Sequence, residues 1–280
     1  MKQLYYFIFI VTSMQVFSQS ELNVMSYNIR LGSANDGDNN WEIRKEKVAD
    51  LLNYYEASFI GLQEVQKFQL DFILKNLSNY DYIGLPREAG EFAEYSCVLY
   101  NKKEFKVVEQ KTIWLSKTPD SVSKGWDAAC HRIVTYGLFK NINSGKQIWI
   151  ANTHFDHEGK VARLESAKLL INLVEELKAK QQVPVIIMGD FNATFDEDSM
   201  QLLSKSMHEA TSVCQTKPYG EKATWNGFNF NSKPKKQIDY IFFDKISKLK
   251  VRKFITINDF YDFKYPSDHL PIMATFQINN

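Results

Sequence analysis

The sequence predicts an α/β protein in which helices cover the outer faces of two mixed β-sheets. Short apolar runs typical of buried strands alternate with segments whose apolar residues recur at helical spacing. Several strand-like runs carry Asp, Glu, Asn or His at one end, where a sheet holds side chains rigidly beside open loops. The chain has 280 residues, 44% of them hydrophobic and 14% aromatic, which is ample for a core and excludes intrinsic disorder.

The first elements follow from simple periodicities. Residues 22–29 (LNVMSYNI) are predicted to form a strand, with Leu22, Val24, Ser26 and Asn28 on one side. The next helices are predicted from apolar residues three or four positions apart, and the next strand from a short apolar run. In chain order these segments are a Gly-, Asn- and Asp-rich loop at 31–40, a helix at 41–55, a strand at 59–62 and a helix at 69–77.

The rest of the chain continues the alternation. Residues 133–139 and 147–152 are predicted to pair, because the sequence NINSG at 141–145 is a typical turn. Residues 161–177 form the clearest helix, with a continuous apolar side. No internal repeat or Pro/Gly/Ser-rich linker interrupts this order, so a single domain over residues 19–280 is predicted. The other predicted strands are 82–85, 95–100, 105–111, 184–188, 238–243 and 272–276.

The N-terminus is predicted to be an export signal. Lys2 precedes an apolar run at 4–11, which is too short to span a bilayer comfortably. Val16 and Ser18 stand at the small-residue positions of a cleavage site before Gln19, so residues 1–18 are predicted to be removed. The mature protein is expected in the periplasm or outside the cell. A buried first strand and an uncleaved anchor are the alternatives.

Charge and cysteine content exclude several classes of protein. The 34 Lys and Arg residues balance the 33 Asp and Glu residues, which excludes a strongly basic nucleic-acid-binding coat and an acidic tail. Cys97, Cys130 and Cys214 lie far apart, with no zinc-site spacing and no disulfide framework. In an oxidising compartment the odd number implies at least one free, buried thiol.

Polar residues with catalytic chemistry cluster at the predicted strand ends. A lone Asp or His at such a position is usually a cap or a structural residue, but the recurrence along one chain favours a site. The residues are Asn28, Glu64 in GLQEV, Asn152, His154 and His157 in NTHFDH, Asp190 and Asn192 in GDFN, Asp239 in QIDY, and Asp268 and His269 in SDH.

This set suits metal-assisted attack on phosphorus. Carboxylates with an amide oxygen are hard ligands, which favour Mg²⁺ or Mn²⁺ over zinc. A phosphate ester carries negative charge, so its hydrolysis needs a cation, hydrogen-bond donors and an activated water. The sequence contains no HExxH zinc motif, no GxxxxGK[ST] phosphate loop and no GxSxG nucleophile elbow, which excludes those enzyme classes.

The ordered set from Asn28 to His269 resembles the endonuclease/exonuclease/phosphatase superfamily, and GDFN followed by a late SDH is specific in combination. The resemblance covers residues 22–276. It implies a four-layer α/β sandwich of the deoxyribonuclease I type, with the site at one end of the packed sheets. The stretch 113–132 is similar to exported bacterial members near the deadenylase-like branch.

The resemblance implies a metal ligand set and a catalytic set. Glu64 is expected to be the main ligand of Mg²⁺ or Mn²⁺, with Asn28 beside it and Asp268 as a second carboxylate on the metal side. The expected catalytic residues are Asp190, which orients or deprotonates the attacking water, Asn192, which fixes the phosphate, His269, which binds phosphate or acts as acid or base, and Asp239, which holds that histidine.

A second group is expected on the leaving-group side of the site. The resemblance implies that His154 lies there and pairs with Glu94, just before a strand. Arg132 is a candidate phosphate clamp, with a surface salt bridge as the alternative. His131 and His157 are further candidate substrate contacts. Three aromatic residues are candidates for stacking on a base or sugar, with core packing as the better default: Trp126, Trp225 and Phe228. Three lysines are candidate contacts to an anionic substrate, with a solvated loop as the better default: Lys233, Lys235 and Lys236.

Three functions remain open from the sequence. The first is an exported metal-dependent nuclease or phosphodiesterase, which the resemblance favours, with nucleic acid as the substrate. The second is a phosphatase or a sphingomyelinase-like enzyme acting on a small or lipid phosphate ester. Only a lipid substrate would imply membrane contact, through the aromatic residues of DFYDFKYP at 259–266. The third is a non-catalytic binding module, which is disfavoured because none of the expected site residues is missing. No stable protein partner is predicted.

Overall fold

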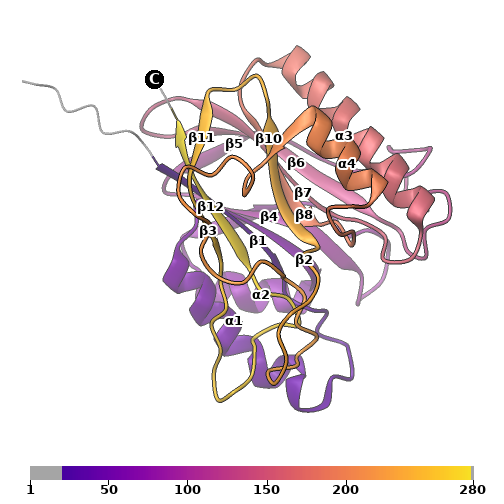
Figure 1. Cartoon of the computed structure of the whole chain (residues 1–280), viewed down its shortest axis with the longest axis vertical. Coiled ribbons are helices and arrows are strands. Elements are labelled where there is room, and N and C mark those ends of the chain that lie inside the picture. The colour runs from indigo at the N-terminus through magenta and orange to yellow at the C-terminus, as the bar shows by residue number, and fades with distance from the viewer. Residues whose placement is uncertain (1–20, 279–280) are drawn as a thin grey trace, which may run out of the picture.

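The computed structural model describes residues 21–278, and the predicted signal segment 1–18 lies outside them. The described chain forms two six-stranded mixed sheets packed face to face, with helices on both outer faces (Figure 1). This four-layer arrangement confirms the predicted fold class. No helix within residues 21–278 is both long enough and apolar enough to cross a membrane.

The first sheet contains the N- and C-terminal strands of the described chain. Its central strands β1 and β2 are parallel, and every other neighbouring pair is antiparallel. Its strands, in spatial order, are β11 (Leu249–Thr256), β12 (Ile272–Ile278), β1 (Glu21–Asn28), β2 (Phe59–Gln66), β4 (Glu94–Asn101) and β3 (Tyr80–Ile83).

The second sheet repeats this plan. Its central strands β7 and β8 are parallel and the remaining pairs are antiparallel. Its strands, in spatial order, are β5 (Phe105–Trp114), β6 (Ile133–Asn141), β7 (Gln147–His154), β8 (Val185–Asp190), β10 (Asp239–Asp244) and β9 (Met207–Glu209).

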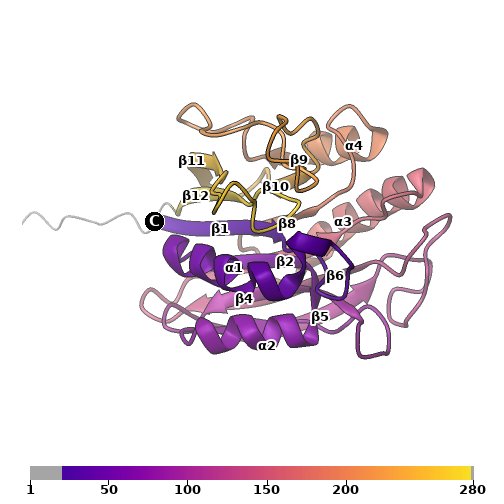
Figure 2. The same cartoon turned by 90° about the horizontal axis from the view of Figure 1, so that it is seen from below.

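Helices close each sheet on its outer side. Helices α1 (Trp41–Tyr55) and α2 (Lys67–Asn76) cover the first sheet, and α3 (Lys160–Lys180) and α4 (Asp198–Ser206) cover the second (Figure 2). The buried apolar residues form three clusters, one between the sheets and one beneath each pair of helices. Each sheet therefore buries both faces, which explains why strands such as β8 are apolar at nearly every position.

The sequence located most elements but not their ends. Helix α1 has the predicted bounds, whereas β2 continues past residue 62 through a bulge to Gln66, so Glu64 lies inside the strand and not after it. Four elements were not predicted: the short 3₁₀ helix η1 (Gly37–Asn39), α4, β9 and β11. Strand β9 has only three residues, and β11 alternates apolar residues with Lys and Arg, so both depend on a neighbouring strand.

The strand directions bring the predicted residues to one end of the sandwich. Asn28, His154 and Asp190 are the last residues of β1, β7 and β8. Strand β10 is antiparallel to β8, so its first residue, Asp239, lies opposite Asp190. For the same reason the segment before β12, which carries His269, reaches this end as well.

Asn152 binds the two sheets together and does not line the site. It is fully buried in β7, and its Nδ2 donates to the carbonyl oxygens of Leu62 (2.8 Å) and Cys97 (2.7 Å) in the opposite sheet. Its Oδ1 accepts a hydrogen bond of 2.6 Å from Gln63 Nε2. This strand-end residue is therefore an inter-sheet connector.

Candidate active site

A pocket of about 550 Å³ opens at this end of the sandwich, a volume that suits a small organic ligand. Asn28 and Asp239 are fully buried behind its wall. His131 is not among the lining residues and lies 2.8 Å from Glu88 through its Nδ1. The sequence-predicted residues that line the pocket are Glu64, Glu94, Arg132, His154, His157, Asp190, Asn192, Trp225, Lys236, Asp268 and His269.

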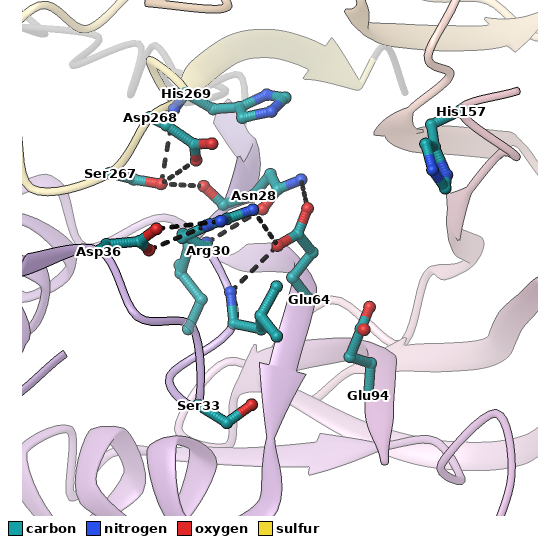
Figure 3. A network of polar contacts seen from close by, with 12 residues as sticks. Asn28, Arg30, Ser33, Asp36, Glu64, Glu94, His157, Ser267, Asp268 and His269 are labelled. Atoms are coloured by element: carbon teal, nitrogen blue, oxygen red, sulfur yellow. Dashed lines mark hydrogen bonds and ion pairs between the residues drawn. The ribbon is translucent and has the colours of Figure 1, made fainter. Parts of the chain in front are cut away.

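Glu64 is held at the pocket by an unusual backbone conformation. Its φ of 60° lies in the left-handed region, at the bulge where β2 loses register with β4. The carboxylate accepts hydrogen bonds of 3.0 Å from Asn28 Nδ2 and from the backbone N–H of Leu31. These contacts fix Glu64 while leaving it at the pocket surface, as Figure 3 shows.

Glu64 and Asp268 form the oxygen-rich side of the pocket. Burial raises the pKa of Asp268, and the positive charge of His269 opposes that rise. Two carboxylates are a donor set for a hard divalent cation such as Mg²⁺ or Mn²⁺, so the residues present fit the expected metal. Asn28 lies beside Glu64 as expected, with its amide nitrogen facing the carboxylates and its amide oxygen accepting from the Arg30 N–H at 3.0 Å.

Asp190 contacts Asn28, Asn192 and His154. Its Oδ2 accepts from Asn28 Nδ2 at 2.9 Å and lies 3.5 Å from His154 Nε2, and its Oδ1 accepts from the Asn192 N–H at 2.9 Å. Burial and the neighbouring Asp239 raise the pKa of Asp190 to about 7. A carboxylate with this pKa is suited to accept a proton near neutral pH.

Asp239 and His269 form a buried pair beside Asp190. His269 Nδ1 lies 2.9 Å from Asp239 Oδ2, and His269 Nε2 lies 3.8 Å from Asp190 Oδ2. Burial disfavours the charged imidazole, but Asp239 and Asp190 outweigh it and raise the pKa of His269 well above its ordinary value. One ligand atom each from Asp190, Asp239 and His269 lies within 4.8 Å of the other two. His269 is therefore cationic beside two acids.

His154 is the neutral histidine of the site. Burial, followed by the charge of Arg132, lowers its pKa well below the ordinary value. Its Nε2 lies 2.9 Å from Asn192 Nδ2, which also donates to the Phe155 carbonyl oxygen at 3.0 Å. Asn192 reaches this position through a φ of 47°, and it holds His154 as well as facing the pocket.

On the leaving-group side, the structure differs from the expected pair of Glu94 with His154 and from the expected role of Arg132 as a phosphate clamp. Glu94, the first residue of β4, forms a two-pronged pair with Arg87 (2.8 and 2.9 Å) and not with His154. Arg132 is buried, and its Nε donates to Asp156 at 3.3 Å while Nη2 lies 2.9 Å from His157 Nδ1. The edge of Arg132 that would clamp a phosphate is therefore already occupied by protein groups.

Asp156 organises this wall and was not identified from the sequence. Its carboxylate accepts backbone N–H bonds from Ala129, Cys130, Glu158 and Gly159. Burial would raise its pKa, but these four donors lower it instead. Its position between two predicted histidines in NTHFDH was the available signal. Arg87 and Arg30, also pocket residues, had no comparable signal.

The aromatic and lysine candidates divide between two places. Trp225 is 42% exposed at the pocket, with Lys236 Nζ 5.9 Å from its ring centre. Trp126 and Phe228 are half-buried and do not line the pocket. Outside the pocket, Phe260 and Phe263 form an exposed ring cluster with Phe230 and Tyr265.

Comparison with known proteins places this geometry in a family. Residues 25–269 match the model of the Endonuclease/Exonuclease/phosphatase family. A family protein from Bacteroides thetaiotaomicron is 33% identical, with a TM-score of 0.88 over 94% of this chain and 96% of that one. A mannosyl-6-phosphatase from the same organism is 34% identical, with a TM-score of 0.87 over 91% and 99%.

More distant relatives act on RNA by name. The CCR4-Not complex 3'-5'-exoribonuclease subunit Ccr4 of Candida glabrata is 22% identical over 294 residues, which cover 85% of this chain. The chain spans only about a third (33%) of that subunit. The model match and the structural neighbours agree with the strand-end carboxylates and histidines described above. This chain belongs to the endonuclease/exonuclease/phosphatase family, whose members hydrolyse phosphoester bonds.

Proposed function

We propose that this protein is an exported, divalent-cation-dependent phosphatase that acts on phosphomonoesters of small sugars. The observation that carries the chemistry is the placement of two acids, Glu64 and Asp268, in one pocket with the cationic His269 and the proton-accepting Asp190. Carboxylates for a hard cation, a fixed positive charge and a base are what attack of water on a phosphate ester requires.

The residues divide the reaction between them. Asp190, with a pKa of about 7, orients the attacking water and takes its proton as the new P–O bond forms. The bond from phosphorus to the sugar oxygen breaks, and that oxygen takes a proton from solvent, so the sugar leaves as an alcohol. His269, kept cationic by Asp239, donates a hydrogen bond to a phosphate oxygen as charge develops there. Neutral His154, held by Asn192, lies 3.5 Å from the Asp190 oxygen that His269 approaches at 3.8 Å, and it contacts the phosphate without adding charge.

Glu64 and Asp268 would hold Mg²⁺ or Mn²⁺ at the pocket surface. Such a cation would neutralise the negative charge of the phosphate more strongly than hydrogen-bond donors of the protein do. Asn28 contributes indirectly, because its amide nitrogen donates to both Glu64 and Asp190 and keeps the cation ligand and the base at a constant separation.

The substrate class is supported by the comparisons and by the shape of the pocket. The mannosyl-6-phosphatase neighbour is 34% identical across nearly its whole length, whereas Ccr4 is 22% identical. A pocket of about 550 Å³ suits a sugar phosphate. The balanced charge of 34 basic against 33 acidic residues argues against binding a long polyanion. These observations move our proposal from nucleic acid to a phosphorylated sugar.

An RNA or DNA nuclease is the second candidate. It is favoured by the exposed Trp225 at the pocket, which could stack on a base, and by the similarity to an exoribonuclease subunit. A lipid phosphodiesterase would instead use the exposed Phe260 and Phe263, which pack on the half-buried Phe230, as a membrane contact.

A substrate screen on the chain from residue 19 tests the proposal. The panel contains hexose 6-phosphates, p-nitrophenyl phosphate, single-stranded RNA and DNA oligomers, and sphingomyelin vesicles, with Mg²⁺, Mn²⁺ or EDTA and with Asp190→Asn as the blank. We expect phosphate release from hexose 6-phosphates that EDTA and the variant abolish. Cleavage of oligomers or lipid without release from sugar phosphates would contradict the proposal.

Export is proposed from the sequence pattern of residues 1–18. Expression of the full chain in a bacterium that exports proteins, followed by fractionation and mass spectrometry, tests it. We expect a mature N-terminus near Gln19 outside the cytoplasm, and recovery of the intact chain in the cytoplasm would refute export.

A further inference from the structure

We infer that the wall formed by Arg87, Glu94, Arg132 and His157, hereafter the far wall, binds the hydroxyl groups of an uncharged sugar or polyol leaving group. The inference rests on the proposed phosphatase function and adds the residues that select the substrate. Figure 3 shows Glu94 and His157 on one side of Glu64, with Asp268 and Asn28 on its other side. A substrate whose phosphate lies between Asp268 and His269 would extend its leaving group toward this wall.

The Arg87–Glu94 pair is rigid and presents both kinds of hydrogen-bonding atom. The two prongs are 2.8 and 2.9 Å, and the side chains are only 15% and 12% exposed. The backbone N–H of Arg87 donates to the carbonyl oxygen of Glu94 at 2.9 Å, so main chain and side chains are locked together. Trp114 Nε1 donates to the Arg87 carbonyl oxygen at 2.7 Å and fixes the arginine from behind. Each Glu94 oxygen keeps a lone pair for a substrate hydroxyl.

Arg132 supplies a free donor beside this pair. Nε and Nη2 are used by Asp156 and His157, whereas Nη1 has no partner among residues 21–278 although the residue is only 5% exposed. Nη1 is not one of the buried, unpartnered side-chain atoms of residues 21–278, so it reaches solvent in the pocket and can donate to a ligand oxygen. His157 accepts from Arg132 through Nδ1, which leaves its proton on Nε2, 3.5 Å from the exposed Glu158.

The charges of the far wall argue for a neutral ligand. Arg87 is paired with Glu94 and lies 3.4 Å from Glu88, and Arg132 is paired with Asp156. The wall therefore offers little net positive charge to a second phosphate, and the carboxylate of Glu94 would repel one. A hydroxyl group both donates and accepts, so it satisfies a carboxylate and a guanidinium side by side. A nucleic-acid leaving strand, with a phosphate on every residue, fits this wall poorly.

The test compares two phosphomonoesters that differ in their leaving group. Hexose 6-phosphate carries hydroxyl groups for the far wall, whereas p-nitrophenyl phosphate carries none. We expect Glu94→Gln, which keeps the shape and removes the charge, to lower kcat/KM for hexose 6-phosphate by about 10–100-fold and that for p-nitrophenyl phosphate by less than threefold. Arg87→Met should show the same split. Glu109→Gln, which weakens the exposed pair with Lys180, is the matched control and should change neither substrate.

Equal losses on both substrates, or no loss on either, would overturn the inference. Equilibrium binding of hexose 6-phosphate by calorimetry in EDTA, where no turnover is expected, separates this failure from failure of the proposed function. If Glu94→Gln binds hexose 6-phosphate more weakly than the control does and has an unchanged melting temperature, the result supports hydroxyl binding by the far wall. This conclusion holds even if another ester proves to be the true substrate. Unchanged binding refutes it.

Discussion

Asn28 and Asp190 join the two sheets at the site: Asn28 Nδ2, at the end of β1, donates a 2.9 Å hydrogen bond to Asp190 Oδ2, at the end of β8. The same nitrogen donates to Glu64 Oε1 at 3.0 Å. One buried amide therefore sets the distance between the proposed base and the proposed metal ligand, although 162 positions separate Asn28 from Asp190. The site depends on the packing of the sheets as much as on either sheet alone.

The first prediction concerns this amide. Asn28→Ala removes a donor that lowers the pKa of Asp190, so that pKa should rise above about 7 and the acidic limb of kcat/KM should move to higher pH. The maximal rate should fall by about 10–100-fold because Glu64 also loses its partner. A pH–rate profile measures both effects. An unchanged acidic limb would show that Asn28 does not act on Asp190.

The second prediction links Asp190 to stability. Its folded pKa, about 7, is above the unfolded value of 3.8, so the folded state binds the proton more tightly and loses stability as pH rises from about 4 to 7. Asp190→Asn removes the buried charge. The difference in melting temperature, variant minus wild type, should therefore be a few degrees larger at pH 8 than at pH 5. Calorimetry at both pH values measures this difference, and a difference of the opposite sign would contradict the raised pKa.

The third prediction concerns the His269–Asp239 pair. The raised pKa of His269 contributes stability that is complete below the unfolded value of 6.5 and is lost as pH rises through the folded pKa. Asp239→Asn removes the largest favourable partner, so the NMR-titrated pKa of His269 should fall and the basic limb of kcat/KM should move to lower pH. The rate at neutral pH should decrease by about 10²-fold. An unshifted His269 titration would exclude Asp239 as the cause.

The fourth prediction concerns the proposed metal. Glu64→Gln removes the negative charge and keeps one of the two hydrogen bonds, because Asn28 and Leu31 donate to different carboxylate oxygens and the Gln amide has one acceptor oxygen. Mg²⁺ should raise the melting temperature of the wild type, and this rise should require at least tenfold more Mg²⁺ in the variant. Glu109→Gln, outside the pocket, should respond as the wild type does. Equal Mg²⁺ responses in the two variants would remove Glu64 from the ligand set.

The fifth prediction tests the connection between the sheets away from the pocket. Asn152→Ala removes the Asn152 donor from the carbonyl oxygens of Leu62 and Cys97, and it removes one of three acceptors of Gln63 Nε2. Each lost partner costs about 1–3 kcal/mol, so the melting temperature should fall by roughly 5–15 °C. Thermal unfolding measures the change. A fall below about 2 °C would show that water or rearrangement replaces these bonds.

The sequence predicted the residues of the site better than their pairings. Asn28, His154 and Asp190 were found because a side chain at a strand end is recognisable from the pattern of apolar residues before it. The partner of Glu94 was not, because Arg87 lies in an irregular segment and pairs with it only when the chain turns back at residues 86–95. Hydrogen-bond partners depend on distances below about 3.5 Å, which periodicity does not encode.

Local sequence alone determined that this chain alternates strands and helices and that carboxylates, amides and histidines stand where strands begin or end, because side-chain period and burial are local properties. Tertiary structure decided which of these residues meet. The packing of two sheets placed Asn28 against Asp190, made Asn152 a connector and directed Arg132 toward Asp156 and His157. It also raised the pKa of Asp190, because burial and a neighbouring acid exist only after the sheets have closed over the site.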